Sequence, residues 1–253
     1  MGGLSGKRVV VTRTRAQAGA LVELLEAAGA EALVFPTIEI VDPPDPGPLD
    51  AAIRDLDVYA WAVFTSANAV ERFFAHLAAV DKDARALYGL RVAAVGPATA
   101  RALEAHGIVP DFVPDEHVGE GVLEGLCVRG VAEGTRVLLP RALEAREVLP
   151  DGLRERGARV DVVPAYQTVT GPGDAWVLER LRAGEADAVT FTSPSTVRGF
   201  LRLAADVDVR RLVVAVIGPI AARAAREAGL AVAVEPKEYT APALVAALEA
   251  YYA

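Results

Sequence analysis

Three blocks of this sequence occur twice in the same order, and no other feature limits the possible folds as much. The paired blocks are residues 9–40 with 137–168, residues 61–74 with 188–201, and residues 92–107 with 214–229. The first residues of the paired blocks are 128, 127 and 122 positions apart, so the spacing drifts by only a few residues. Ordered repetition of this kind indicates internal duplication. We therefore predict a tandem duplication that gives two similar domains.

Each block begins with a short apolar run and continues into a segment rich in Ala, Leu, Glu and Arg. The runs are VVVT, AVFT, VAAV, VLL, AVTF and VAVI, beginning at residues 9, 62, 92, 137, 188 and 214. Apolar runs without alternation are typical of parallel strands that are buried on both faces. The helical segments end at Gly29, Gly107, Gly157 and Gly229, where a left-handed C-terminal cap is expected. The alternation predicts an α/β fold of two three-layer, parallel-sheet domains.

The composition excludes several classes of function. With 26 Lys and Arg against 34 Asp and Glu, a net charge of -8 and a pI near 5.0, the chain lacks the basic excess of a nucleic-acid-binding protein. The longest apolar run, residues 212–222, is too short to cross a bilayer. One cysteine and three scattered histidines offer no metal centre, so we expect neither metal nor cofactor. The start of the chain shows no signal-like apolar segment, and we expect a cytoplasmic protein.

The turns that follow the predicted strands carry the polar groups of interest. These turns are Thr65-Ser66, Gly96-Pro97, Ser193-Pro194-Ser195 and Gly218-Pro219. Each leads into a helix, whose N-terminus presents free N–H groups that can bind an anion. Ligands of parallel sheets bind at the carboxyl ends of the strands, so these turns are candidate substrate contacts. For the hydroxyl residues, helix capping alone explains their positions equally well.

Arg13 and Arg141 follow the first strand of their repeats, where we expect the guanidinium to stay out of the core. Such an arginine forms either a surface salt bridge or a clamp for a carboxylate. Pro150 would disrupt a helix interior, so the helix that follows Arg141 is expected to start near it. Residues 141–148 would then form a loop with Arg141 and Arg146 at the rim of the sheet.

Tyr166 interrupts the repeat, because its counterpart 128 positions earlier is Ile38. One interpretation is a partly buried tyrosine whose hydroxyl contacts water. The other is a functional hydrogen-bond donor, since a phenol keeps its proton at pH 7. The residues alone favour the first interpretation.

The ordered set of these segments resembles uroporphyrinogen-III synthase along nearly the whole chain. The resemblance is carried by VVVTRTRAQAGAL, VFTSANAVERFF, VAAVGPATARALEAHG, GARVDVVPAYQT, FTSPSTVRGFL and VIGPIAARAAREAGL. It implies that the chain leaves a first domain, completes a second and returns, which gives residues 1–39 with 168–253, and residues 40–167. It also implies closure of the linear tetrapyrrole hydroxymethylbilane, with loss of water and inversion of the last pyrrole ring. No cofactor is implied.

The resemblance also assigns roles to individual residues. Tyr166 matches the tyrosine that assists departure of the substrate hydroxyl, and the polar positions that line the binding cleft match Thr65, Ser66, Thr99, Ser193 and Ser195. Arg13, Gly96, Arg141 and Arg146 complete our set of candidate substrate contacts. Two departures affect individual contacts: Ile220-Ala221 stand where many members have threonines, and Ala142 and Ala145 replace glycines.

A second kind of function stays open from the sequence, namely a non-catalytic two-domain protein that closes on a small anion, or a regulatory protein of the same fold. For the enzyme, we expect a monomer whose partner is the small-molecule substrate hydroxymethylbilane. We expect neither nucleic acid nor a membrane as a partner.

Overall fold

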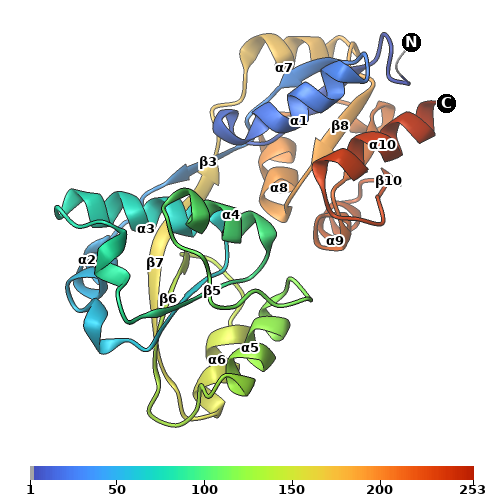
Figure 1. Cartoon of the computed structure of the whole chain (residues 1–253). Coiled ribbons are helices and arrows are strands. Elements are labelled where there is room, and N and C mark those ends of the chain that lie inside the picture. The colour runs from blue at the N-terminus through green and yellow to red at the C-terminus, as the bar shows by residue number, and fades with distance from the viewer. Residues whose placement is uncertain (1–2) are drawn as a thin grey trace. The chain divides into compact units, whose positions relative to one another are not determined.

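The computed structural model describes residues 3–253, which fold into a mixed α/β protein with two parallel sheets (Figure 1). The chain divides into two compact units. Unit 1 combines the chain up to Glu39 with Thr168–Ala253, and unit 2 is Ile40–Gln167.

Unit 1 contains a five-stranded sheet in the order β10-β9-β8-β1-β2, and its strands pair in parallel. The strands are β1 Arg8–Val11, β2 Glu31–Val34, β8 Ala188–Phe191, β9 Val213–Val216 and β10 Val232–Val234. The helices are α1 Arg15–Ala27, α7 Ala175–Arg182, α8 Pro194–Leu203, α9 Pro219–Glu227 and α10 Ala241–Tyr252. Helices α1 and α10 cover one face and α7, α8 and α9 the other, so a hydrophobic cluster lies on each side of the sheet.

Unit 2 is built around a second five-stranded sheet, in the order β3-β7-β6-β4-β5. Its strands are β3 Ile38–Val41, β4 Trp61–Phe64, β5 Arg91–Ala94, β6 Arg136–Ala142 and β7 Arg159–Thr170. The helices are α2 Gly47–Arg54, α3 Ala67–Ala79, α4 Pro97–Ala105, α5 Gly119–Val128 and α6 Val148–Glu155. One core cluster lies under α2, α3 and α4, and the other under α5 and α6. Strands β3 and β7 carry the chain between the units.

The repeated blocks occupy equivalent positions in the two sheets. By sequence, β6, β7, β4 and β5 match β1, β2, β8 and β9, and the order β7-β6-β4-β5 repeats the order β2-β1-β8-β9. In each sheet the connections run outward in opposite directions from one central pair, β1 and β8 in unit 1 and β6 and β4 in unit 2. Such a switch point is where open parallel sheets bind ligands, at the carboxyl ends of the strands.

The predicted strands lie within one residue of the observed ones, except that β6 continues to Ala142. Gly29, Gly107, Gly157 and Gly229 have φ between 80° and 90°, which confirms the left-handed helix ends. The expected loop over residues 141–148 was too long. Helix α6 starts at Val148, and Pro150 lies in its first turn, where the missing N–H costs no helical hydrogen bond.

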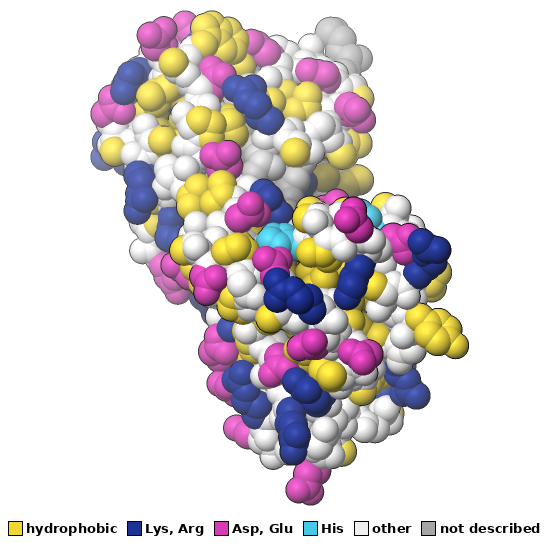
Figure 2. Space-filling model, turned by 90° about the vertical axis from the view of Figure 1, so that its left-hand side faces the viewer, with side chains coloured by type: hydrophobic (Ala, Val, Ile, Leu, Met, Phe, Trp, Pro, Cys, Tyr) yellow, Lys and Arg dark blue, Asp and Glu magenta, His cyan; other side chains and the backbone are white. Residues whose placement is uncertain are grey.

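No helix in residues 3–253 is long and apolar enough to span a membrane. On the face drawn in Figure 2, acidic and basic side chains are interspersed, and no continuous basic surface is visible. This face therefore lacks the charge pattern of a nucleic-acid interface.

Candidate functional site

The switch point of unit 2 gathers most of the candidate residues. Thr65 and Ser66 directly follow β4, and Arg141 lies near the end of the adjacent strand β6. Because the two strands are parallel, these residues lie at the same edge of the sheet. Ser66 caps helix α3, since its Oγ accepts a hydrogen bond from the backbone N–H of Ala69 at 3.2 Å. Ser66 therefore serves as a helix cap, as its position predicted, and Thr65 lies half-buried beside it.

Tyr166 reaches this switch point because β7 contains a bulge. Arg141 pairs with Pro164 and Ala142 pairs with Tyr166, so Ala165 is an extra residue in the ladder. Strict alternation would place Tyr166 on the face of Val160, toward α5 and α6. The bulge instead places its ring in the core under α3, where it is only 7% exposed.

The hydroxyl of Tyr166 contacts Ser66 rather than being left to water alone. The distance between Tyr166 Oη and Ser66 Oγ is 3.1 Å, within hydrogen-bonding range. A helix cap and a buried phenol, which lie 100 positions apart in sequence, therefore form one polar pair at the carboxyl edge of the sheet.

Arg141 is buried, contrary to our expectation of an exposed arginine at the rim. It is 6% exposed, because β6 continues past it and the following loop folds back over its guanidinium. Its Nη1 donates to the carbonyl of Arg146 at 2.9 Å, and its Nη2 pairs with the Glu147 carboxylate. Its Nε is buried without a partner. A buried N–H donor without an acceptor is costly, which makes this atom a candidate contact for an anion.

Arg146 remains exposed, as expected, and its guanidinium forms an ion pair with Glu120 of α5 at 3.3 Å. The pKa of Glu120 lies below its ordinary value, first because of a hydrogen bond from its own backbone N–H and then because of Arg146. A substrate carboxylate that bound Arg146 would compete with Glu120.

Arg13 occupies the matching position at the switch point of unit 1, after β1. It is half-buried, its Nε has no hydrogen-bond partner, and burial lowers its pKa from the ordinary value. Burial is the only influence on that pKa, and no ion pair within the described part of unit 1 involves this guanidinium, so the expected surface salt bridge is not present there. An arginine stays charged even with a lowered pKa, and this charge is therefore available to an anion.

Ser193 and Ser195 lie together at the start of α8, across the unit 1 switch point from β1. Ser193 Oγ accepts from the backbone N–H of Thr196 at 3.3 Å, while Thr196 Oγ accepts from the N–H of Ser193 at 3.2 Å. This reciprocal capping box satisfies the helix end. Ser193 Oγ also lies 3.0 Å from Ser195 Oγ.

The two Gly-Pro turns are each covered by a ring that the sequence analysis missed. A Cβ on Gly96 would lie 3.2 Å from Cβ of His117, and one on Gly218 would lie 2.8 Å from Cδ1 of Tyr239. Both glycines have extended backbones, so close approach of a side chain, rather than a special φ, favours glycine. His117 and Tyr239 are 122 positions apart, like Gly96 and Gly218, and that spacing was the available signal.

The third residue of each Gly-Pro helix is buried in both units. Thr99 on α4 is 3% exposed, and its counterpart Ala221 on α9 is also 3% exposed. Where many family members have threonines, this chain has Ile220 and Ala221. Ala221 therefore lacks a hydroxyl at a buried position, whereas Ile220 is 51% exposed.

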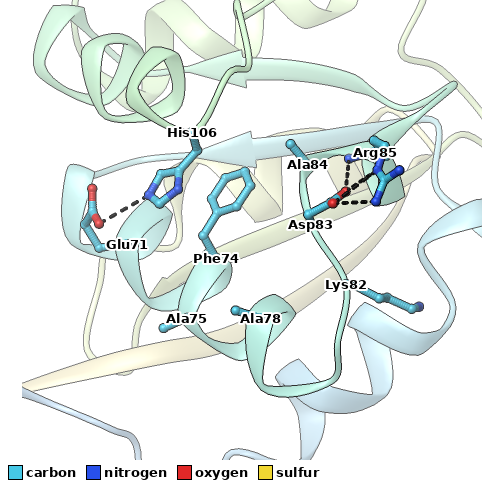
Figure 3. A pocket seen from close by; sticks show the side chains of 9 residues that line it. All are labelled: Glu71, Phe74, Ala75, Ala78, Lys82, Asp83, Ala84, Arg85 and His106. Atoms are coloured by element: carbon cyan, nitrogen blue, oxygen red, sulfur yellow. Dashed lines mark hydrogen bonds and ion pairs between the residues drawn. The ribbon is translucent and has the colours of Figure 1, made fainter.

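A groove of about 650 Å³ in unit 2 lies away from these residues (Figure 3). It is formed by α3 from Glu71 to Ala78, the segment 82–85 and His106, which directly follows α4. His106 stacks flat on Phe74, with 4.1 Å between ring centroids, and pairs with Glu71 at 3.3 Å. No candidate residue lines the groove. Helix α3 starts at the switch point, so its second half lies toward the opposite edge of the sheet. Among residues 3–253 there is also no cluster of three or more metal-ligating side chains.

The family model described as "Uroporphyrinogen-III synthase HemD" matches residues 19–246. A relative from Methanothermobacter thermautotrophicus is 39% identical over 95% of this chain and 96% of its own length. A relative from Synechococcus elongatus, named uroporphyrinogen-III synthase, is 36% identical over 97% and 96%.

Two solved structures share the fold. Uroporphyrinogen III synthase from Thermus thermophilus, in a mutant form, has a TM-score of 0.66 at 22% identity and covers 97% of this chain and 98% of that one. The corresponding protein of Helicobacter pylori has a TM-score of 0.64 at 20% identity, covering 95% and 97%. The match of the family model and the level of identity to full-length relatives lead to one conclusion: the chain belongs to the uroporphyrinogen-III synthase family.

Proposed function

We propose that this protein is a lyase that closes hydroxymethylbilane to uroporphyrinogen III, with loss of water and inversion of the last pyrrole ring. The observation that carries the proposal is the Tyr166–Ser66 pair, which places a phenol at the switch point of unit 2. A phenol is neutral in its resting state, so it can hydrogen-bond to the departing hydroxyl without placing a negative charge beside a polyanionic substrate before the reaction starts. The pyrrole nitrogen stabilises the cation that remains.

The substrate carries eight carboxylates, and we propose that matched groups in the two units bind part of them. Arg13 and Arg141 each present a buried Nε without a partner, and Arg146 lies in the loop just before α6. Thr65, Gly96 and Thr99 in unit 2, with Ser193 and Ser195 in unit 1, surround the N-termini of three helices. These N-termini favour anions, which helps an acidic protein to hold an acidic substrate.

We further propose that the two units are domains produced by a tandem duplication, with residues 1–39 and 168–253 in one and 40–167 in the other. The matching strand orders and the division into compact units support this proposal. A monomeric state, a cytoplasmic location and independence from cofactors stay predictions.

The test is to incubate the purified protein with hydroxymethylbilane and to separate the product isomers after oxidation to porphyrins. Uroporphyrinogen III, in excess over the type I isomer that forms without enzyme, is the expected result. A binding or regulatory protein would leave type I as the product at the uncatalysed rate, and that outcome would contradict the proposal.

A further inference from the structure

The contact between Ser66 and Tyr166 constrains the direction of the phenol proton. Ser66 Oγ lies 3.1 Å from Tyr166 Oη and accepts from the N–H of Ala69 at 3.2 Å. Each hydroxyl has one proton to donate, and only one proton can lie between the two oxygens. The direction of this hydrogen bond therefore decides whether the phenol donates its proton to Ser66 or can donate it to a different acceptor.

The hydrogen-bond partners of Ser66 favour one direction. Within unit 2, its Oγ has two partners, the Ala69 N–H and the Tyr166 hydroxyl. If Tyr166 donated, Ser66 Oγ would accept twice and its own proton would lack an acceptor in unit 2. Either direction leaves one hydroxyl proton without an acceptor in unit 2, that of Ser66 or that of Tyr166. Donation by Ser66 is favoured because the Ala69 N–H polarises the Ser66 hydroxyl and strengthens its donation.

The duplicated unit shows that a helix cap does not need a tyrosine partner. Ser193 caps α8 as Ser66 caps α3, but its Oγ contacts Ser195 Oγ at 3.0 Å. The residue that matches Tyr166 in unit 1 is Ile38, which has no hydroxyl. The Ser66–Tyr166 contact is thus an addition to the capping role, brought about by the bulge at Ala165.

We propose that Ser66 is a positioning residue for Tyr166, an inference that rests on the proposed function. Its hydroxyl donates to the phenol oxygen, and the phenol proton is thereby directed out of unit 2 toward the departing substrate hydroxyl. When the carbon–oxygen bond breaks, this proton joins the leaving oxygen to form water. The Ser66 hydrogen bond stabilises the negative charge that develops on the phenol oxygen, which then recovers the proton that the closing ring loses.

The experiment is a double-mutant cycle of Ser66→Ala and Tyr166→Phe, measured with hydroxymethylbilane as kcat, KM and product isomer. We expect Ser66→Ala to lower kcat roughly 10- to 100-fold, the scale of a misoriented catalytic group, with little change in KM. In the Tyr166→Phe background the same change should leave kcat within about twofold, because the donor that it orients is absent. Ser66→Thr keeps the hydroxyl and should restore most of the rate.

Thr240→Ala is the matched control, because Thr240 Oγ caps α10 through the N–H of Ala243 at 3.3 Å and contacts no tyrosine hydroxyl. It should lower the melting temperature as Ser66→Ala does and leave kcat unchanged. Three outcomes would overturn the positioning role without affecting the proposed synthesis of the type III isomer. They are an equal loss of kcat in both backgrounds, a rise in KM alone, and a loss of kcat that Thr240→Ala reproduces. Absence of type III product from the wild-type protein would overturn the proposed function and this inference together.

Discussion

Arg13 and Arg141 occupy matched positions in the two units, yet their charges are compensated differently. Arg141 is paired with Glu147 and with the Arg146 carbonyl, whereas Arg13 has no ion pair within the described part of unit 1. The Arg141 guanidinium is buried while the Glu147 carboxylate is half-exposed, so removal of the arginine costs its buried hydrogen bonds rather than leaving a buried charge unpaired. Removal of Arg13 leaves no carboxylate of the described part of unit 1 without its partner.

We predict that Arg13→Gln raises KM for hydroxymethylbilane and leaves the free energy of unfolding almost unchanged, since only a ligand contact is lost. Arg141→Gln should raise KM and also destabilise the protein by about 1–3 kcal/mol, because this buried side chain loses its hydrogen bonds to Glu147 and to the Arg146 carbonyl. Steady-state kinetics and urea unfolding of both variants check this. Equal destabilisation by the two substitutions would show that Arg13 has a structural partner.

The phenol of Tyr166 gives the sharpest residue-scale prediction about catalysis. Tyr166→Phe retains the ring in the core and removes only the hydroxyl that contacts Ser66. General-acid assistance contributes about 10²- to 10⁴-fold, so we expect kcat to fall within that range. The remaining turnover should still give the type III isomer, because the fold of the bound substrate is kept. A variant with the wild-type kcat would reduce Tyr166 to a packing residue.

Tyr59 provides a prediction about alkaline stability. Burial, followed by a hydrogen bond to Asp161, raises its pKa to about 12. The unfolded chain releases this proton near pH 10, so the stabilisation is complete below that pH and is lost as the pH rises toward 12. The free energy of unfolding should therefore fall more steeply between pH 10 and pH 12 in the wild type than in Tyr59→Phe. Parallel curves from urea titrations would contradict this assignment.

At the scale of elements, the sequence was sufficient to predict the features that depend on local residue patterns. Apolar runs predicted the repeated strands, and the glycines after the helices predicted their left-handed ends. The bulge at Ala165 was not predictable, because it arises from the register between β6 and β7. The burial of Arg141 was missed for a similar reason, since it depends on a loop that folds back to supply Glu147 and the Arg146 carbonyl. Nonlocal packing thus decided the two details that most affect the candidate site.

Helix α8 packs closely on the segment after β2, so the addition of a single methyl group there should measurably lower the stability of the protein. A Cβ on Gly199 would lie 2.1 Å from the carbonyl oxygen of Thr37, a backbone atom that cannot move aside easily. We expect Gly199→Ala to destabilise the protein by about 1–3 kcal/mol. Gly19→Ala on α1 is the matched control, because nothing lies within 4 Å of its Cβ. That change should stabilise by about 0.5–1 kcal/mol through helix propensity. Similar shifts in thermal unfolding for both variants would contradict the close contact.

At the scale of the whole molecule, one unit is continuous in sequence and the other is assembled from both ends of the chain. Each has its own parallel sheet with a hydrophobic cluster on either face. A unit of this kind contains what a domain needs to fold by itself. The two segments of unit 1 also meet closely, since the N–H of Gly171 donates to the carbonyl of Thr37 at 2.9 Å and that of Gly173 to Pro36 at 3.1 Å.

These contacts predict that each unit folds alone once its chain ends are treated correctly. Residues 38–170, which keep β3 and β7 complete, should fold as one piece, and residues 1–37 joined to 171–253 by a short glycine linker should fold as the other. The linker can be short because the atoms that it joins are already hydrogen-bonded neighbours. Both pieces should unfold cooperatively in urea and show dispersed amide signals in NMR spectra. Neither should form type III product, since the proposed substrate contacts are divided between them. A piece that stays soluble but unfolds without a cooperative transition would show that its core is completed by the other unit.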